Sequence, residues 1–273
     1  MKKVFVASIS KTKFDAISYS DDLQSIFRRI KDLGYDGIEL GIRDPLEVDV
    51  SLVESYSERF ELPVIAIGTG QAYVDEGLSL TSEDMEVQKR AIDRIKKHID
   101  LAARLGASVI IGLIRGNPSR QRMGEALSLL RKNLGICAGY AEESNVIILL
   151  EPVNRYESSL LNRLSEGKAF IESLEKSNYG VVRLLADTFH MNIEERDIPE
   201  AIEEVFPLIG HIHVADSNRL APGQGHTDFD SIFKKLKELG YKRYISAEIL
   251  PQPSFDEAAR LTMDFLCTKD ILL

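Results

Sequence analysis

The sequence predicts an α/β protein, a single (β/α)8 TIM barrel that spans residues 1–273 as one domain. Short runs of Val, Ile and Leu recur without polar alternation, which is typical of parallel strands buried on both faces. A segment with helical periodicity follows each run, and eight strand-then-helix units suit a chain of about 250 residues. No linker or low-complexity stretch divides the chain. An open doubly wound sheet also alternates, but it usually carries a glycine fingerprint after its first strand, and ISKTKF has none.

The first half of the chain contains four of these units. The expected strands are residues 4–9, 37–42 (GIELGI), 63–68 (PVIAIG) and 108–114 (SVIIGLI). The first helix is expected to begin at Asp21, carries apolar residues at helical spacing, and ends at Gly34, because glycine is common just after a helix. The next three helices are expected over residues 50–60, 82–105 and 123–144, and the apolar stripe of the second of these runs from Val87 to Ala102.

The second half contains the other four units. Its expected strands are residues 146–150 (VIILL), 181–186 (VVRLLA), 209–212 (IGHI) and 244–247 (YISA). Helices are expected over residues 166–176, 198–206, 229–239 and 254–265. The motif LGY at residues 33–35 returns at residues 239–241, and this repetition indicates the same turn from a helix into the next strand.

The composition excludes several classes of protein. With 34 basic and 43 acidic residues, the formal net charge is −9, which argues against nucleic acid as a partner. Cys137 and Cys267 form no disulfide framework or CxxC unit, as is typical of a reducing cytoplasm. The N-terminal MKKVFVASIS is too short for a signal-peptide core, and no run approaches the roughly 20 apolar residues of a membrane helix. We therefore expect a cytoplasmic protein with no membrane partner.

Acidic or imidazole side chains directly follow the last four expected strands. They are Glu151, Asp187, His213 and Glu248, each about one strand-helix unit from the next. Because the C-terminal ends of barrel strands meet at one rim, we expect these side chains to lie together. Burying such charge costs stability unless a partner compensates it. Three carboxylates and one imidazole favour Mn²⁺, Mg²⁺ or Co²⁺ over a structural zinc, so we expect one divalent metal ion, with Mn²⁺ as the first choice.

Four short segments include or follow these residues: EPVNRYE (151–157), DTFHMN (187–192), HVADSNR (213–219) and APGQGHTDF (221–229). Each resembles a motif of the ketose 3-epimerases related to D-tagatose 3-epimerase. The order and spacing of the motifs from Val146 to Ile249 are similar to those of the xylose-isomerase-like TIM-barrel superfamily. The resemblance is less specific for any one substrate.

The resemblance implies a role for seven residues. Glu151, Asp187, His213 and Glu248 match the metal ligands, Glu151 and Glu248 also match the catalytic proton-moving residues, and Glu157, His190 and Arg219 match substrate-binding positions. Inverting a carbon next to a ketone means removing a proton on one face and returning one on the other. Two carboxylates beside a metal ion can do this while the metal stabilises enediolate charge as a Lewis acid. Structural roles for Glu157, His190 and Arg219 remain as alternatives.

Arginines in the expected loops predict an anionic substrate. The family members that act on free ketohexoses usually place a tryptophan after the fourth strand, and this chain has no tryptophan. Its loop reads IRGNPSRQR, with Arg115 directly after the strand, and Arg43 follows the second strand. Arginine suits a carboxylate or phosphate, so Arg115 is a candidate substrate-binding residue. Surface salt bridges are the alternative for each arginine.

Two other histidines, His98 and His211, are expected to be structural. His98 lies on an expected helix, and His211 is expected to point opposite to His213, toward the helix layer.

These observations predict a divalent-metal-dependent epimerase of a ketose or keto-sugar acid that works through an enediolate, and we expect a homodimer or homotetramer. An aldose–ketose isomerase similar to hydroxypyruvate isomerase would use the same residues. An abasic-site endonuclease of the superfamily would need extra histidines after the second and third strands, where GIRDP and GTGQAY have none. A non-catalytic sugar-binding protein is the alternative outside enzymes.

Overall fold

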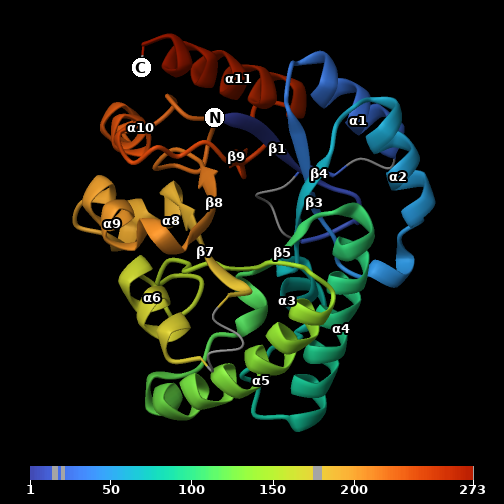
Figure 1. Cartoon of the computed structure of the whole chain (residues 1–273), viewed down its shortest axis with the longest axis vertical. Helices are drawn as coiled ribbons and strands as arrows, with labels where there is room; N and C mark the ends of the chain where they lie inside the picture. The colour runs from blue at the N-terminus through green and yellow to red at the C-terminus, as the bar shows by residue number, and fades with distance from the viewer. Residues whose placement is uncertain (14–17, 20–21, 175–179, 273) are drawn as a thin grey trace.

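The computed structural model describes residues 1–13, 18–19, 22–174 and 180–272. Parallel strands occupy the middle of the molecule and helices surround them (Figure 1). The barrel strands are β1 (Lys2–Ser8), β3 (Gly37–Gly41), β4 (Val64–Gly68), β5 (Ser108–Ile111), β6 (Ile148–Leu150), β7 (Val182–Asp187), β8 (Ile209–Val214) and β9 (Tyr244–Ala247). Each strand pairs in parallel with the next, and β9 pairs with β1, so the sheet closes. The predicted TIM barrel is therefore confirmed.

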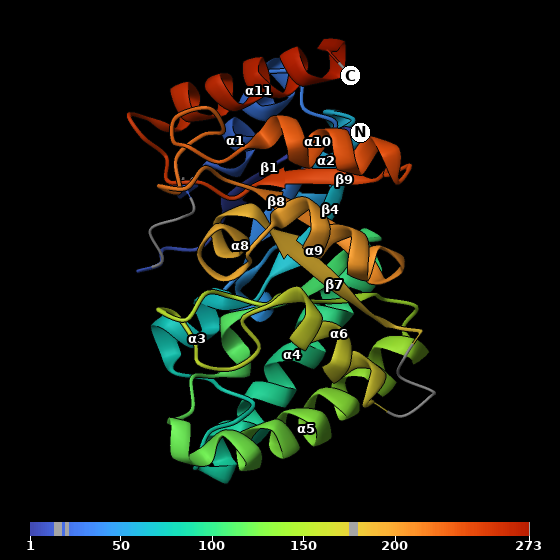
Figure 2. The same ribbon diagram turned by 90° about the vertical axis from the view of Figure 1, so that its left-hand side faces the viewer.

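Helices follow the strands on the outside of the barrel, as Figure 2 shows from a second direction. The main helices are α1 (Leu23–Asp32), α2 (Val50–Arg59), α4 (Met85–Leu105), α5 (Met123–Glu143), α6 (Leu164–Glu172), α9 (Ile198–Val205), α10 (Phe229–Glu238) and α11 (Phe255–Leu272). Two short helices, α3 (Gly70–Glu76) and α8 (Thr188–Glu194), directly follow β4 and β7 and were not expected as separate elements. A two-residue strand, β2 (Ser18–Tyr19), adds to β1 outside the ring.

The boundaries differ from expectation where local geometry decides them. The expected strand 108–114 ends at Ile111, because Gly112 turns the chain (φ −99°, ψ −106°) and a 3-10 turn, η2 (Leu113–Arg115), follows. In contrast, β8 continues two residues beyond expectation, so His213 lies inside the strand. The expected helix start at Asp21 and the expected helix end at residues 175–176 fall outside the described residues.

The inside of the barrel is divided into an apolar part and a polar part. Ala66, Ile110, Leu149 and Leu185 from β4 to β7 form a small buried cluster. On β3, β8 and β9 the buried residues include polar ones: Glu39, His211, His213 and Ser246. A larger apolar core packs the strands against the helices. The polar part of the barrel interior therefore lies on the side of the strands that carry His213 and Glu248.

Among the helices whose residues are described, none combines the length and the apolar character needed to cross a membrane.

Candidate metal centre and active site

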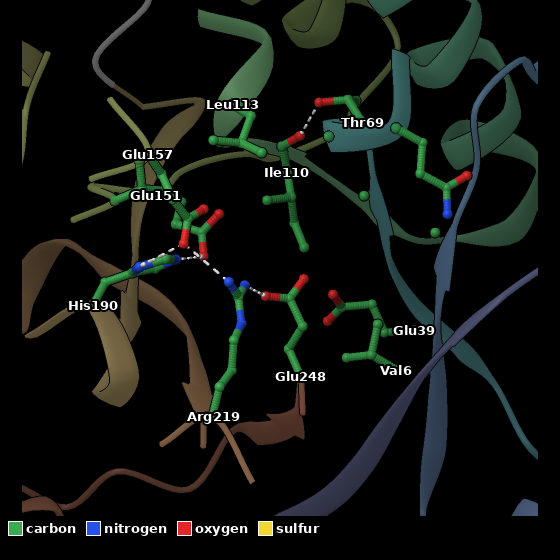
Figure 3. A pocket seen from close by; sticks show the side chains of 16 residues that line it. Val6, Glu39, Thr69, Ile110, Leu113, Glu151, Glu157, His190, Arg219 and Glu248 are labelled. Atoms are coloured by element: carbon green, nitrogen blue, oxygen red, sulfur yellow. Dashed lines mark hydrogen bonds and ion pairs between the residues drawn. The ribbon is translucent and has the colours of Figure 1, made fainter. Parts of the chain in front are cut away.

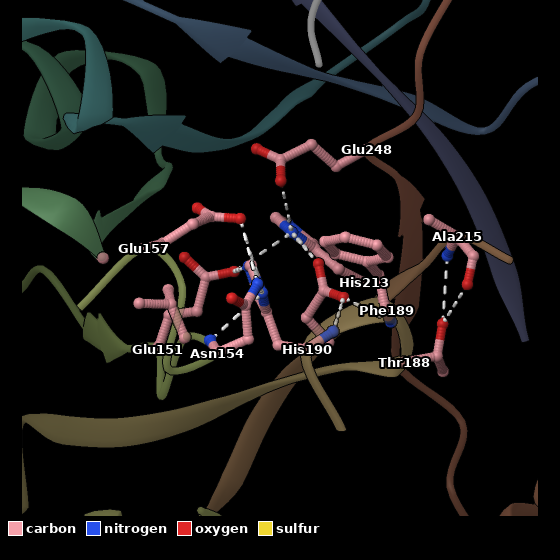
Figure 4. A network of polar contacts seen from close by, with 12 residues as sticks. Glu151, Asn154, Glu157, Thr188, Phe189, His190, His213, Ala215 and Glu248 are labelled. Carbon is pink, nitrogen blue, oxygen red and sulfur yellow. Dashed lines mark hydrogen bonds and ion pairs between the residues drawn. The ribbon is translucent and has the colours of Figure 1, made fainter. Parts of the chain in front are cut away.

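The structure brings the four predicted metal ligands together at the C-terminal rim of the barrel. Glu151 follows β6, Asp187 ends β7, His213 lies near the end of β8, and Glu248 follows β9. One potential ligand atom from each residue lies within 4.8 Å of the others. In Figure 4, the side chains of Glu151, His213 and Glu248 point toward a shared space. The strand ends therefore position this group, as parallel strands of a barrel should.

Three atoms of this group are buried without a hydrogen-bond partner among the described residues. They are Oε1 of Glu151, Oδ2 of Asp187 and Nδ1 of His213. Nδ1 of His213 lies 3.6 Å from Asp187 Oδ2, 3.7 Å from Glu151 Oε1 and 4.0 Å from Glu248 Oε2. Leaving a buried acceptor unsatisfied costs about 1–3 kcal/mol. Because oxygen and imidazole lone pairs converge here, the residues fit a divalent cation.

Burial and mutual repulsion perturb the carboxylates of this group. Burial raises the pKa of Glu151, and the neighbouring Glu248 raises it further. Burial also raises the pKa of Glu248, against the attraction of Arg219. A positive ion between these groups would stabilise their charged forms and lower both pKa values again.

A glycine leaves room for one of the carboxylates. A Cβ atom at Gly112 would lie 2.4 Å from Oε2 of Glu151, so any larger residue would collide with this side chain. The turn at Gly112 thus has a steric reason besides its backbone conformation.

A carboxylate that the sequence analysis missed contacts His213 on the side of its ring opposite to Nδ1. Both oxygens of Glu39, on β3, lie 3.1 Å from Nε2 of His213. Nε2 of His213 can donate its hydrogen to Glu39, which leaves the lone pair of Nδ1 facing Glu151 and Asp187. Glu39 is a single carboxylate inside the apolar run GIELGI, and this break in the pattern was the available signal.

His211 points into the barrel, which corrects the expectation that it faces the helix layer. Its Nε2 lies 3.2 Å from Glu39 Oε2 and 2.7 Å from Ser246 Oγ. Residues two apart on a strand share a face, so His211 and His213 both point inward. His98, in contrast, occupies the buried structural position that was expected. Its two ring nitrogens each lie 2.9 Å from a backbone carbonyl oxygen, one of Arg94 and one of Ile42.

The tautomer of His190 is set by Asn154, a second residue without an assigned role in the sequence analysis. The amide Nδ2 of Asn154 lies 2.8 Å from Nδ1 of His190 and donates 3.0 Å to Glu157 Oε1. Oδ1 of Asn154 accepts from the backbone N–H of Tyr156, which fixes the amide orientation. Burial lowers the pKa of His190 to about 4, so the ring is neutral near pH 7. Its proton is therefore on Nε2, on the side of Glu151, 3.9 Å from Oε1.

Arg219 joins two of the glutamates. It donates to Glu157 Oε1 at 2.9 Å and to Glu248 Oε2 at 3.0 Å (Figure 3). Its guanidinium carbon lies 4.8 Å from the ring centroid of Phe189. Together these contacts hold the carboxylates of Glu157 and Glu248 in place. Glu248 is one of the four candidate metal ligands, and these four residues are called the metal group below.

The structure places Arg115 inside the protein, which contradicts its predicted contact with substrate. The side chain is fully buried and donates to the backbone carbonyls of Leu160 and Leu161, each at 3.0 Å, and of Glu151. The guanidinium fork therefore satisfies loop carbonyls around β6 and does not line the recess described below. Arg43 forms a salt bridge with Glu47 at 2.5 Å, which is the alternative that the sequence analysis gave for the arginines. The prediction of an anionic substrate thus loses its structural support.

The metal group lies at one side of a recess in the barrel mouth. Four glutamates, His190 and Arg219 contribute to its lining, together with Val6, Ile110 and Leu113 (Figure 3). Glycines 41, 68, 70 and 112 and the polar residues Thr69 and Gln71 complete much of the remaining wall. The empty volume is about 490 Å³, with the opening to solvent included.

Comparisons with known proteins agree with this geometry. The family profile described as "xylose isomerase-like TIM barrel" matches residues 27–268. An L-ribulose 3-epimerase from Mesorhizobium japonicum is 31% identical over 255 residues, which cover 89% of this chain and 81% of the relative. A 3-dehydro-D-guloside 4-epimerase from Escherichia coli (strain K12) is 25% identical over 240 residues, covering 84% and 88% of the two chains.

A solved structure shows the same likeness. The D-allulose 3-epimerase from Methylomonas sp., in complex with D-allulose, aligns with a TM-score of 0.82 and 25% identity, covering 98% of this chain and 97% of that one. The chain therefore belongs to the xylose isomerase-like TIM barrel family and, within it, groups with the ketose 3-epimerases.

Proposed function

We propose that this protein is a divalent-metal-dependent epimerase that inverts a carbon next to the ketone of a ketose or a related keto-sugar. The observation that carries the proposal is the pairing of Glu151 and Glu248 around the unpartnered atoms of Asp187 and His213. The names of the relatives support it, because they are 3-epimerases of ketoses and a 4-epimerase of a keto-glycoside. Both kinds of reaction remove and return a proton next to a carbonyl group.

Glu151, Asp187, His213 and Glu248 would hold the metal ion, with Mn²⁺ as the first choice and Co²⁺ or Mg²⁺ as alternatives. When bound, the ion would supply Lewis-acid stabilisation of the negative charge that develops on the substrate oxygens.

The side chains of the protein would move and hold protons. One of Glu151 and Glu248 removes the proton beside the ketone, and the other returns a proton to the opposite face. His190 donates from Nε2 to a substrate oxygen, because its Nδ1 is occupied by Asn154. Arg219 keeps Glu157 and Glu248 in place through its two ion pairs.

The test is proton exchange in heavy water. The metal-loaded protein is incubated with a panel of ketoses, and NMR identifies which carbon acquires deuterium. An epimerase labels the carbon that it inverts, C3 or C4, whereas an aldose–ketose isomerase labels C1 or C2. A sugar-binding protein without activity labels none, and that result would refute the proposal. Glu151→Gln and Glu248→Gln serve as matched controls, since each keeps a coordinating oxygen but loses the base.

A further inference from the structure

A second cavity lies at the N-terminal end of the barrel, opposite to the rim that carries the metal group. Residues of β1, β4, β5, β6, β8 and β9 line it, together with the end of α4. Its empty volume is about 1020 Å³, with the opening to solvent included. In Figure 2 the N-terminus marks this end, because the arrowheads of β7 and β9 point away from it. The proposed proton transfer uses no residue of this cavity.

Three cationic side chains, Lys2, Lys242 and Arg243, line the cavity on the side of β1 and β9. All three are exposed, and none forms a salt bridge with a described carboxylate. No aspartate or glutamate is among the described residues of the lining. The chain as a whole carries a formal charge of −9, so this cavity is a positive site on an acidic protein. A cavity lined by one sign of charge concentrates ions of the opposite sign.

Contacts between β1 and β9 bring these cations together. The backbone N–H of Lys2 donates to the backbone oxygen of Arg243 at 3.1 Å. Lys2 Nζ lies 3.5 Å from the hydroxyl of Tyr244 and 5.2 Å from the centroid of its ring. Arg243 donates from Nη1 to the backbone oxygen of Ile209 at 3.1 Å, and its other N–H groups make no hydrogen bond to a described residue. The cations are therefore held near one another, with donors available for a ligand.

His211 forms part of the inner wall of the cavity. Its side chain is 3% exposed and does not line the recess at the other end of the barrel, so this exposure faces the N-terminal cavity. Nε2 lies against Glu39 and Ser246, whereas Nδ1 makes no hydrogen bond to a described residue. Glu39 only accepts, so in the neutral ring the proton is on Nε2 and Nδ1 carries a lone pair. A hydroxyl group of a ligand can donate to this nitrogen.

The wall on the side of β4 and α4 is apolar. It includes Pro63, Ile65 and Leu105. Helix α4 ends at Leu105, and the C-terminal end of a helix carries a partial negative charge. An anion is therefore drawn to the wall of β1 and β9, while the carbon atoms of an organic ligand can pack against the apolar wall.

We propose that this cavity binds the phosphate group of a small molecule, either inorganic phosphate or a small phosphate ester, and that Lys2, Lys242 and Arg243 hold its oxygens. Phosphate fits better than a carboxylate because it offers an oxygen to each of the three cations, whereas a carboxylate has two oxygens. The site goes beyond the proposed epimerase function and uses none of the metal ligands, so its test does not depend on that function.

The first test is isothermal titration of inorganic phosphate and of ribose 5-phosphate into the protein in a phosphate-free buffer, with and without Mg²⁺. We expect binding in both conditions. Without a metal ion the recess at the other rim presents four carboxylates, which repel phosphate, so binding by the metal-free protein points to the N-terminal cavity. Tighter binding of the ester would identify an organic phosphate as the ligand, and equal or weaker binding would identify inorganic phosphate. Ribose is the control for the sugar part.

Two matched variants each remove two positive charges. Lys2→Gln/Lys242→Gln, in the cavity, should weaken phosphate binding at least about tenfold, because charge-assisted hydrogen bonds are lost. Lys89→Gln/Lys132→Gln, at exposed positions on α4 and α5, makes the same change of net charge and should bind as the wild type does. Circular dichroism checks the folding of both variants, which we expect to be intact because all four side chains are exposed.

A ¹⁹F NMR measurement locates the bound phosphate. In protein labelled with 3-fluorotyrosine, phosphate should shift the signal of Tyr244, which the variant Tyr244→Phe identifies. The signal of Tyr156, which is 80% exposed on the loop after β6, should stay in place. The proposal is overturned if neither phosphate binds, if Lys2→Gln/Lys242→Gln keeps the affinity of the wild type, or if Tyr156 shifts and Tyr244 does not.

Discussion

Glu39 offers a direct test of how the barrel interior prepares the metal centre. Its carboxylate lies 3.1 Å from Nε2 of His213 and 3.2 Å from Nε2 of His211. In Glu39→Gln the amide oxygen can still accept from one imidazole, but the amide nitrogen then faces the other. The negative charge that supports His213 as a ligand is also lost.

The expected cost follows from the position of Glu39 behind a ligand. Replacing such a partner typically weakens metal binding about 10- to 100-fold. At about 1.4 kcal/mol for each factor of ten, this is about 1.4–2.8 kcal/mol of binding free energy. The stabilisation of the fold by saturating Mn²⁺ should fall by the same amount, because a ligand stabilises the folded state in proportion to RT ln(1 + [L]/Kd).

The assay is isothermal titration of the metal-free protein with Mn²⁺ near neutral pH, with circular dichroism as the check on folding. Glu54→Gln is the control, because Glu54 is a surface carboxylate on α2 that pairs with Arg104 at 2.8 Å. A folded Glu39→Gln protein that binds Mn²⁺ as tightly as the wild type would refute this account of His213.

Further results are expected from variants and from changes of pH. Glu151→Gln and Glu248→Gln should each lose about 100-fold or more in kcat and remain folded; near-normal turnover by either variant would disprove the two-carboxylate mechanism. Because the metal-free pKa values of Glu151 and Glu248 lie above the ordinary value of 4.5, the metal-free protein should lose stability as pH rises through those values. Metal binding displaces the same protons, so the melting-temperature increase caused by Mn²⁺ should grow as pH rises through those values, and a constant increase would contradict this. Arg115→Met should cost at least about 3 kcal/mol in urea unfolding, since buried carbonyls lose their donor, without changing substrate charge preference. Gly112→Ala should displace Glu151 and lower Mn²⁺ affinity measurably, and unchanged titration curves would show that the site adapts.

The sequence alone was sufficient to predict the barrel and the grouping of its four candidate ligands. Unbroken apolar runs identify strands buried on both faces, and their regular alternation with helices leaves few topologies. In a closed parallel barrel the strand ends lie on one rim, so residues that end consecutive strands must be neighbours. Glu151, Asp187, His213 and Glu248 could therefore be grouped without knowledge of any contact between them.

Only the tertiary structure decided what surrounds these ligands. Glu39 meets His213 across 174 positions of sequence, and Gln71 meets Ser8 across 63, through hydrogen bonds that no local pattern encodes. Arg115 shows the same limit: a 3-10 turn after Gly112 carries its side chain into the protein, although its place after a strand suggested the mouth. Periodicity reports which face of a regular element is buried, whereas the direction of a side chain after a turn depends on backbone angles and on distant partners. Those quantities exist only once the chain has folded.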